Sequence, residues 1–504
     1  MSREAYARID ELPRRWSRES PEAVALREGE RNVDWRTLQR AIDRGAQWLA
    51  GEGAGRGDRV MIVAENSIAM IALLFAASAS GATAVIVNPR LSERELDGIR
   101  DHASPRVTVL VGDSAAEIDA HAERCGATPV AFTDVGPLRV SCREDSTPDH
   151  DLDDVAAIVY TSGTSGRPKG VMLTHANLLF VATASAQLRR LGPTDRVFGA
   201  LPIYHVYGLA SVLLGTFCAG ACLVLFARFD ARRAIAALAR GELTVFQGVP
   251  AMYARMLERL GTDGRAATPG LRYLYAGGSP LDRTLKADVE RRFGLPLHNG
   301  YGLTECSPTV SQTRLDAPRA DTSVGPPIPG IRISIVGEGD RDVGNGGVGE
   351  LCVSGPNVMK GYYRDADATA EAITRDGWLR TGDLARQDDD GALHIVGRSK
   401  ELIIRSGLNV YPIEIETVLN AHPAVSQSVV VGRALADANE EVVAFVELAP
   451  GANVTSAELL AYAGAQLAPY KRPTELKILD ALPSSGTGKV LRGQLKSLAD
   501  RSSR

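Results

Sequence analysis

The hydrophobic pattern of the first 320 residues alternates between short apolar runs and longer stretches of helical periodicity. Runs at residues 59–66, 83–89 and 221–226 have the length and the β-branched content of buried parallel strands. Residues 231–242 (ARRAIAALARGE) place apolar side chains at i, i+3 and i+4, which predicts an amphipathic helix. This alternation predicts layers of helices around parallel sheets.

Two uncharged stretches, residues 68–87 and 208–226, are about as long as a bilayer span. Both are interrupted by Gly, Ser and Ala, and both end in a short strand-like run. We therefore expect each to form a buried helix, a tight glycine turn and a buried strand, with no transmembrane segment.

The pattern changes in the last third of the chain. After about residue 320, short strands alternate with Gly, Pro, Asn and Asp turns, which predicts a β-rich region. From about residue 410, the pattern predicts a helix, two strands and a second helix, enough for a small α+β domain. The predicted fold class is α/β, with a large N-terminal domain of layered α/β subdomains plus a β-rich subdomain, and a small C-terminal domain.

Composition narrows the class of protein. The chain has 504 residues, of which 44% are hydrophobic and 23% charged, as in soluble multidomain proteins. The net charge of −4 gives no reason to expect a nucleic acid as partner. The six cysteines contain no CxxC pair and the N-terminus has no apolar signal-peptide core, so a cytoplasmic protein is expected.

The strongest local signal is residues 155–170, VAAIVYTSGTSGRPKG. An apolar strand leads directly into a loop of hydroxyls and glycines that ends in a lysine, and such a loop can surround phosphate oxygens. The spacing is not that of a Walker A loop. We expect a phosphate cradle rather than a flexible surface turn, formed by Thr161, Ser162, Gly163, Thr164, Ser165 and Lys169.

Four further segments carry polar groups suited to nucleotide chemistry. Residues 299–305 (NGYGLTE) offer a ring for base stacking and a carboxylate for a hard cation, and residues 381–383 (TGD) offer a carboxylate for ribose hydroxyls. Residues 397–412 combine basic groups with a glycine turn, and residues 484–492 (SSGTGKVLR) present a lysine. Each segment alone is equally well explained as a turn, a cap or a solvated surface. Their occurrence together, in this order, favours a shared site.

The ordered motifs YTSGTSGRPKG, AGGSPL, NGYGLTE, GWLRTGD, GRSKELI and GTGKVLR resemble those of the adenylate-forming superfamily. That superfamily comprises acyl-CoA synthetases, nonribosomal-peptide adenylation domains and firefly luciferases. The resemblance covers essentially the whole chain. It implies an N-terminal adenylation domain of residues 1–399 and a mobile C-terminal domain of residues 400–504, with the hinge at Lys400.

The resemblance also implies two half-reactions. A carboxylic acid first attacks the α-phosphorus of ATP to give an acyl-adenylate and pyrophosphate, and CoA then displaces AMP. ATP, Mg²⁺ and coenzyme A are therefore expected as substrates rather than bound prosthetic groups.

By resemblance, individual residues take the following roles. The loop from Thr161 to Lys169 holds the β- and γ-phosphates, and Glu305, helped by Thr304, holds Mg²⁺. Lys489 bridges the substrate carboxylate and the α-phosphate, and His205 orients the carboxylate or the thiol. The adenosine is expected to contact Gly277, Gly278, Ser279, Asn299, Gly300, Tyr301, Gly302, Thr304, Asp383 and Arg398. The CoA-side positions are Gly407, Leu408, Arg90 and Arg472.

The identity of the acid is expected to follow from the acyl pocket. By resemblance its walls are His205, Val206, Tyr207, Gly300, Gly302, Leu303, Cys306 and Pro308. Malonate-activating relatives carry an arginine where this chain has Gly300, so a dicarboxylate would bury an unpaired charge. The two glycines are expected to widen the pocket. A medium- or long-chain fatty acid is therefore expected first, and an aryl acid next.

Three classes of function remain open from the sequence. The first is a CoA ligase, and the second is an adenylating enzyme that loads a carrier protein in trans or, like luciferase, oxidises its adenylate. The third is a non-catalytic binding protein, which the presence of Glu305, Asp383, Arg398 and Lys489 disfavours. The expected partners are a small-molecule carboxylic acid, ATP and CoA, and a homodimer is left open.

Overall fold

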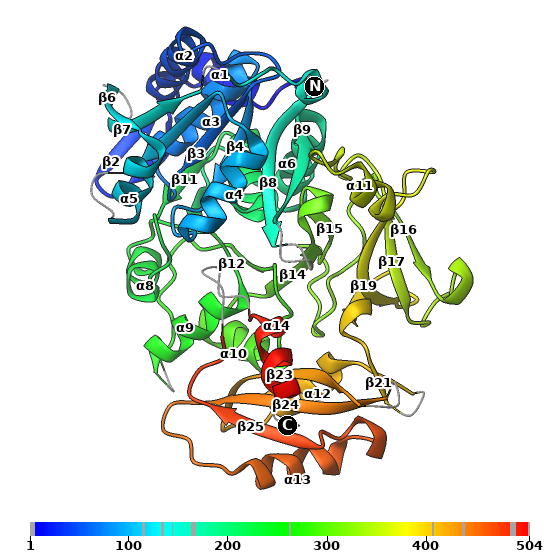
Figure 1. Cartoon of the computed structure of the whole chain (residues 1–504). Helices are drawn as coiled ribbons and strands as arrows, with labels where there is room; N and C mark the ends of the chain where they lie inside the picture. Colours follow the sequence, from blue (N-terminus) through cyan, green and yellow to red (C-terminus); the bar gives the residue numbers. More distant parts are fainter. Residues whose placement is uncertain are drawn as a thin grey trace.

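The computed structural model describes residues 6–112, 116–132, 136–143, 145–162, 168–261, 264–405, 408–435, 439–483 and 490–501. Two large sheets and a smaller sheet form the N-terminal part, and a hairpin and a small three-stranded sheet lie in the C-terminal part (Figure 1). The predicted fold class, α/β with a large N-terminal domain and a small C-terminal domain, is confirmed.

The first sheet has eight strands, parallel except at its two edges. The apolar run at residues 221–226 provides one of its central strands, whose residues are all buried. In spatial order the strands are β15 (Thr309–Gln312), β14 (Leu297–Gly302), β13 (Tyr273–Ala276), β12 (Val245–Gly248), β10 (Arg196–Gly199), β11 (Cys222–Leu225), β1 (Val24–Glu28) and β2 (Arg31–Asp34).

The second sheet also has eight strands, and those at its centre are parallel. Two of these central strands are the runs at residues 59–66 and 83–89 that were predicted as buried strands. All residues of β3 and β4 are buried, because helices cover both faces of this part of the sheet. In order the strands are β18 (Gly361–Tyr362), β9 (Pro168–Thr174), β8 (Val155–Ser162), β4 (Thr83–Val87), β3 (Arg59–Val63), β5 (Val107–Val111), β7 (Gly136–Cys142) and β6 (Thr128–Phe132).

Helices surround and separate these two sheets (Figure 1). The predicted helix at residues 231–242 is α8. The helices of this part are α1 (Glu11–Glu19), α2 (Trp35–Gly51), α3 (Ile68–Ser80), α4 (Glu93–Ala103), α5 (Ala116–Cys125), α6 (His175–Leu188), a π-helix (Tyr207–Leu214), α7 (Gly215–Cys218), α8 (Ala231–Ala239), α9 (Pro250–Leu260), α10 (Arg283–Phe293) and α11 (Ala366–Ala372).

Both uncharged stretches have the predicted form. The first is α3, capped by the Ser67 side chain and ended by Gly81 in the left-handed conformation, followed by β4. The second is the π-helix and α7, followed by Gly220 at φ +68° and β11. Among the described residues, no helix has the length and apolar character to cross a membrane.

The β-rich region forms a four-stranded antiparallel sheet of β16 (Arg332–Val336), β17 (Gly349–Ser354), β19 (Leu379–Gln387) and β20 (Leu393–Arg398). The C-terminal part follows a short 3-10 turn at Ser399–Glu401. It contains a hairpin of β21 (Ile403–Arg405) and β22 (Leu408–Val410), a sheet of β23 (Val425–Ala434), β24 (Glu440–Leu448) and β25 (Glu475–Leu479), and helices α12 (Pro412–Asn420), α13 (Ser456–Gln466) and α14 (Arg492–Arg501).

Within the described ranges, the hydrophobic cores of the two parts share no residue. The large clusters that fill the N-terminal part end at Ile395, whereas the clusters of the C-terminal part begin at Ile403. A domain boundary at residue 400 remains a prediction, and this separation of the cores supports it.

Candidate active site

A carboxylate, a phenol and an amine from three segments lie together beside the β8–β9 hairpin. The Tyr362 hydroxyl on β18 donates a hydrogen bond to Oε1 of Glu305 at 2.9 Å. Lys169 Nζ lies 4.7 Å from the centre of the Tyr362 ring. Burial raises the pKa of Tyr362, so its hydroxyl remains a donor. The backbone also fixes this segment, because the Met359 amide donates to the Glu305 carbonyl at 2.9 Å.

This arrangement suits a divalent cation and phosphates. Among the described residues, only Oε1 of Glu305 has a hydrogen-bond partner, and Oε2 has neither a hydrogen-bond nor an ion-pair partner. Carboxylate oxygens are the ligands that Mg²⁺ prefers, and an amine beside them can bind the phosphates that share the cation. Tyr362 was missed by the sequence analysis, since it belongs to none of the recognised motifs.

The phosphate-loop residues begin where β8 ends. Thr161 is paired with Lys169, and Ser162 with Pro168, across the β8–β9 hairpin. The predicted contacts Gly163, Thr164 and Ser165 lie outside the described residues.

A second cluster is built on the pairing of β19 with β20. Asp383 and Arg398 are cross-strand neighbours, and Arg398 Nε lies 2.9 Å from Oδ1 of Asp383. The Tyr301 hydroxyl donates to Oδ2 of the same carboxylate, which is buried. Burial raises the pKa of Tyr301 well above its usual value, so it stays neutral. The ring expected to stack on adenine and the carboxylate expected to bind ribose are therefore held together as one unit.

The AGGSP segment forms an edge of the same region. Gly277 is buried at the end of β13, while Gly278 and Ser279 are exposed. Gly278 has φ +80°, which only glycine adopts without strain. A Cβ on Gly277 would lie 3.3 Å from Cε1 of Tyr275 and 3.5 Å from Cε1 of Tyr207. Two tyrosine rings thus pack directly against this glycine edge.

Asn299 is engaged in holding a loop. Its Nδ2 donates to the carbonyls of Thr322 at 3.1 Å and Ser323 at 3.3 Å. Only its side-chain oxygen is left for a nucleotide.

The structure changes the interpretation of Gly300 and Gly302, which were expected to widen the acyl pocket. A Cβ on Gly300 would lie 1.8 Å from the Tyr275 hydroxyl, and one on Gly302 would lie 2.2 Å from the Pro308 carbonyl oxygen. The space beside each glycine is therefore already filled by protein atoms. These glycines allow close packing of strands and a tyrosine rather than an open tunnel.

The remaining acyl-pocket candidates surround the start of the π-helix and the turn after β14. His205 is exposed, and its Nδ1 accepts a hydrogen bond from the Tyr207 amide at 3.3 Å. Val206 and Cys306 are buried, and burial raises the pKa of the Cys306 thiol well above its usual value. Such a thiol is a packing group, not a nucleophile. Leu303 is half-buried, and its amide donates to the Pro308 carbonyl at 3.0 Å; Thr304 is buried in the following 3-10 turn.

The CoA-side candidates are spread over the molecule. Arg90 pairs with Glu65 at 3.4 Å beside a cavity of about 170 Å³, and Arg472 Nε donates to the Leu467 carbonyl at 3.0 Å. Leu408 is exposed on the β21–β22 hairpin, and Lys400 is exposed in the 3-10 turn before it. Gly407 and Lys489 lie outside the described residues.

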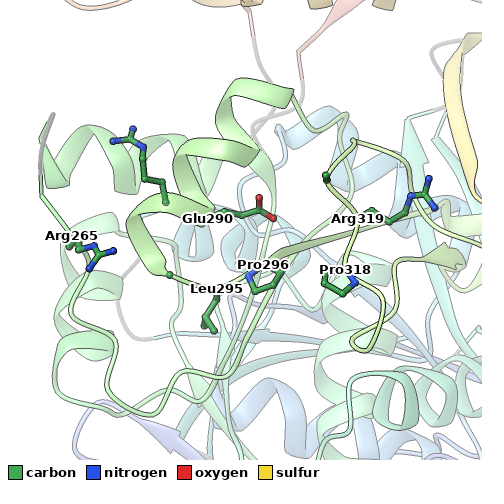
Figure 2. A pocket seen from close by; sticks show the side chains of 9 residues that line it. Arg265, Glu290, Leu295, Pro296, Pro318 and Arg319 are labelled. Atoms are coloured by element: carbon green, nitrogen blue, oxygen red, sulfur yellow. The ribbon is translucent and has the colours of Figure 1, made fainter.

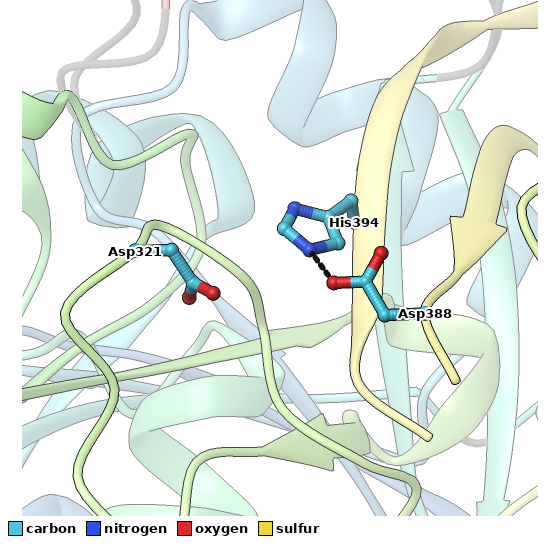
Figure 3. A group of neighbouring side chains, drawn as sticks. All are labelled: Asp321, Asp388 and His394. Carbon is cyan, nitrogen blue, oxygen red and sulfur yellow. Dashed lines mark hydrogen bonds and ion pairs between the residues drawn. The ribbon is translucent and has the colours of Figure 1, made fainter. Parts of the chain in front are cut away.

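Two further features lie apart from these clusters. A pocket of about 540 Å³ lies next to the C-terminal end of α10, and some of its lining side chains are labelled in Figure 2. Its lining residues are Arg265, Glu290, Arg291, Gly294, Leu295, Pro296, Pro318, Arg319 and Ala320. Figure 3 shows Asp321, Asp388 and His394, whose ligand atoms lie within 4.8 Å of one another. Arg319 already pairs with both aspartates and lowers the pKa of Asp321, so this group needs no metal for charge balance.

Comparison with known proteins relates the chain to two family models, two curated enzymes and a solved structure. The family model described as AMP-binding enzyme matches residues 13–363, and that of the AMP-binding enzyme C-terminal domain matches residues 414–489. Feruloyl-CoA synthase from Amycolatopsis sp is 36% identical over 498 residues, covering 96% of this chain and 97% of its own. The 2-succinylbenzoate–CoA ligase of Geobacillus kaustophilus is 35% identical over 483 residues, covering 95% and 96%. The crystal structure of ATP-bound MatB from Rhodopseudomonas palustris superposes with a TM-score of 0.88 at 31% identity, covering 99% of this chain and 100% of the other.

Proposed function

The chain belongs to the family of AMP-binding enzymes and is an acid–thiol ligase that forms acyl-CoA thioesters, and from that premise we propose that its acid is an aryl carboxylic acid. The observation that carries the proposal is the pair of buried rings, Tyr207 and Tyr275, at the glycine edge of the site. Their centroids are 6.2 Å apart at an interplanar angle of 69°, and aromatic edges and faces of this kind favour a flat ring.

The same rings disfavour a long alkyl chain. A fatty acid needs a continuous tunnel, and the Tyr275 hydroxyl fills the space beside Gly300 where the sequence analysis expected one. The names of the two relatives, feruloyl-CoA synthase and 2-succinylbenzoate–CoA ligase, also specify ring-bearing acids. The order of preference is therefore aryl acid first and fatty acid second, the reverse of the order expected from the sequence alone.

The first half-reaction brings two anions together, so its barrier is lowered mainly by neutralising charge. An oxygen of the acid attacks the α-phosphorus, and the bond to the pyrophosphate oxygen breaks. We assign the β- and γ-phosphates to Lys169 and the hairpin loop, and the α-phosphate to Lys489. Mg²⁺ would be held by Glu305, next to Thr304, and would supply positive charge to the phosphates.

The nucleoside end has its own set of residues in this proposal. Asp383 and Arg398 bind the ribose hydroxyls, and Tyr301 lies against the adenine together with the edge formed by Gly277, Gly278 and Ser279. Because Tyr301 and Arg398 already hold the Asp383 carboxylate, the ribose meets a group that is fixed before ATP arrives.

The second half-reaction requires CoA to reach the same carbonyl carbon. The sulfur of CoA forms the thioester bond, the bond between the acyl carbon and the phosphate oxygen breaks, and the thiol proton passes to solvent. We propose that rotation at Lys400 removes Lys489 and brings the β21–β22 hairpin, with Gly407 and Leu408, to the site. His205, exposed at the start of the π-helix, orients the carboxylate or the thiol.

A panel of acids tests the proposal. Ferulate, cinnamate and benzoate are compared with octanoate and palmitate in the presence of ATP, Mg²⁺ and CoA, with pyrophosphate release and thiol consumption measured in parallel. We expect kcat/KM for the best aryl acid to exceed that for either fatty acid by roughly ten-fold or more. A preference for the fatty acids would refute the aryl assignment and leave the ligase activity intact.

The same assay tests the acceptor. If pyrophosphate is released but no CoA thiol is lost, CoA is not the acceptor. The acyl-adenylate would then be transferred to a carrier protein or oxidised. Equal amounts of pyrophosphate and thioester support the CoA assignment.

A further inference from the structure

Asn66 joins the carboxyl ends of strands from the two large sheets. It lies just beyond β3 of the second sheet and directly precedes Ser67, the residue that caps α3. Only 1% of its surface is exposed. Its hydrogen-bond partners belong to residues 199–203, which leave the first sheet at the end of β10. Buried polar groups are nearly always hydrogen-bonded, so these partners show which segment Asn66 fixes.

The Asn66 side chain bonds to three backbone groups of this segment. Its Nδ2 donates to the Gly199 carbonyl at 3.2 Å and to the Leu201 carbonyl at 2.9 Å. Its Oδ1 accepts from the Ile203 amide at 2.9 Å. Residues 200–206 form the connection between β10 and the π-helix, and buried backbone groups in a connection need side-chain partners. One amide therefore sets the course of this connection.

The fixed segment leads directly to the acyl side of the site. His205 lies two positions beyond it, and the His205 amide donates to the Pro202 carbonyl at 3.0 Å. The π-helix, which begins at Tyr207, packs closely against the same turn, because a Cβ on Gly208 would lie 2.1 Å from the Pro202 carbonyl oxygen. A displacement of the segment would therefore move His205 and the start of the π-helix with it.

A second buried asparagine makes the same set of bonds elsewhere in the site. Asn177 on α6 donates from Nδ2 to the carbonyls of Pro356 at 2.8 Å and Val358 at 2.9 Å. Its Oδ1 accepts from the Thr174 amide at 3.0 Å. The next amide along the chain after Val358 donates to the Glu305 carbonyl. Asn177 thus holds a segment on the cation side, whereas Asn66 holds one on the acyl side.

We propose that Asn66 is a positioning residue for the acid, and that it acts by holding the segment that carries His205 and leads to Tyr207. The inference rests on the proposed function, in which His205 orients the carboxylate and the Tyr207 ring favours a flat acid. Positioning of this kind matters because a displacement of about 1 Å in a site can reduce the rate about 100-fold.

Asn66→Ala and Asn177→Ala form a matched pair, because each removes a buried amide with three backbone hydrogen bonds. KM for the acid and KM for ATP are measured separately by pyrophosphate release, with the best acid of the panel. For Asn66→Ala we expect KM for the acid to rise about ten-fold or more while KM for ATP stays within about three-fold. For Asn177→Ala, KM for the acid should stay within about three-fold. Both variants should lower Tm, so a loss of stability alone does not count as support.

A double substitution separates positioning from a general loss of stability. His205→Ala and Asn66→Ala disturb the same contact with the acid if the inference is right. Their effects on KM for the acid should then combine to less than the product of the two single effects. If His205→Ala alone leaves KM for the acid unchanged, the role of His205 in the proposed function is wrong, and the single substitutions at Asn66 decide.

Asn66→Ser replaces the alanine variant if that variant does not fold. Its hydroxyl keeps one polar group at this position. Asn66 also lines the cavity of about 170 Å³, so water can reach the backbone groups that the shorter side chain leaves. We expect the same selective rise in KM for the acid, by about three-fold or more.

The outcomes separate the inference from the proposed function. The inference is wrong if the Asn66 variants raise both KM values alike, or leave KM for the acid at the wild-type value. It is also wrong if the effects of Asn66→Ala and an effective His205→Ala multiply. If the wild-type enzyme releases pyrophosphate with no acid of the panel, the proposed function itself fails.

Discussion

At the residue scale, the proposed nucleotide end of the site is built around one buried carboxylate, Asp383, with two named partners. Asp383 accepts from the Tyr301 hydroxyl and pairs with Arg398, so the three side chains fix one another. A charged hydrogen bond of this kind contributes more than a neutral one, about 1.5 to 3 kcal/mol. Changes at Asp383 should therefore affect ATP binding before they affect the acid.

Asp383→Asn is expected to raise KM for ATP about 10- to 100-fold, because the charge that orients Arg398 and the ribose is lost. This KM is measured from the initial rates of pyrophosphate release at a series of ATP concentrations. Asp388→Asn, on the loop between β19 and β20, makes the same chemical change away from the site and should leave KM for ATP near the wild-type value. If the two substitutions raise KM for ATP equally, Asp383 does not belong to the nucleotide site.

Tyr362→Phe removes the hydroxyl that holds Glu305 and keeps the ring beside Lys169. We expect the Mg²⁺ concentration at half-maximal rate to rise about three- to ten-fold, since the carboxylate loses one orienting hydrogen bond. A titration of Mg²⁺ at saturating ATP measures this shift. The neighbouring change Tyr363→Phe is the control, because that ring packs against His102 instead. An unchanged Mg²⁺ requirement in Tyr362→Phe would contradict the role of Glu305.

The motifs in the sequence include Glu305, Asp383 and Lys169, and also Tyr301 and Arg398, which hold Asp383, but they do not include Tyr362, which holds Glu305. Tyr362 is 57 positions from Glu305, and Asn66 is 135 positions from Leu201, so no local pattern records either contact. Such pairs arise only when sheets and helices have packed together.

At the element scale, the buried strands and helices follow directly from the apolar runs. β3, β4 and α3 have the predicted positions because strongly apolar runs have no favourable alternative to burial. The π-helix at Tyr207–Leu214 could not be predicted, because its apolar run is the same as that of an α-helix. The close neighbours of the β14 glycines could not be predicted either, since they belong to other parts of the chain; that these glycines line the acyl pocket remains a prediction.

Gly300→Ala is expected to destabilise the protein by about 1 to 3 kcal/mol, because its Cβ would overlap the Tyr275 hydroxyl. Urea unfolding measures the change. Adding Tyr275→Phe removes that hydroxyl and should recover part of the loss, although the Ser311 carbonyl still crowds the site. Gly98→Ala in α4 has open space around it and should be neutral or stabilising. If Gly300→Ala leaves the free energy of unfolding unchanged, the space beside Gly300 is open, as the sequence predicted.

Two buried histidines make the stability of the protein depend on pH. Burial lowers the pKa of His175 on α6 and of His298 on β14 to about 4 each. Their contribution to stability is fully present above the unfolded pKa of about 6.5 and is lost as pH falls towards 4. Between pH 7.5 and pH 5 we expect the free energy of unfolding to fall by roughly 2 kcal/mol for each histidine. Urea unfolding at the two pH values measures this, and His298→Asn should reduce the pH dependence; an unchanged pH dependence would contradict the assignment.

At the scale of the whole molecule, the change of sequence pattern near residue 400 corresponds to a change of hydrophobic core. The sequence could indicate that a small α+β domain follows, because a helix, two strands and a second helix are recognisable in that part. The sequence could not show which surfaces of the small domain contact the larger domain. Contacts between the two domains are few, and the polar positions along the sequence follow no fixed period.

Lys400→Pro is the prediction at this scale. Proline fixes φ near −65° and removes the backbone donor, so rotation at the hinge should be hindered. We expect thioester formation to fall at least ten-fold while pyrophosphate release stays within about three-fold, with each half-reaction measured separately. Lys400→Ala keeps the backbone free and should leave both rates nearly unchanged. Equal losses in both half-reactions for Lys400→Pro would place the hinge elsewhere.

The separation of the two cores has a consequence for engineering. Because no buried apolar residue of the described chain is shared between the part that ends at Ile395 and the part that begins at Ile403, we expect that each part can be varied without repacking the other. If the acid is chosen by the π-helix and the first sheet, as proposed, its choice should be independent of the C-terminal domain. A library that exchanges the C-terminal hundred residues among relatives would tune thiol transfer while the choice of acid stays unchanged.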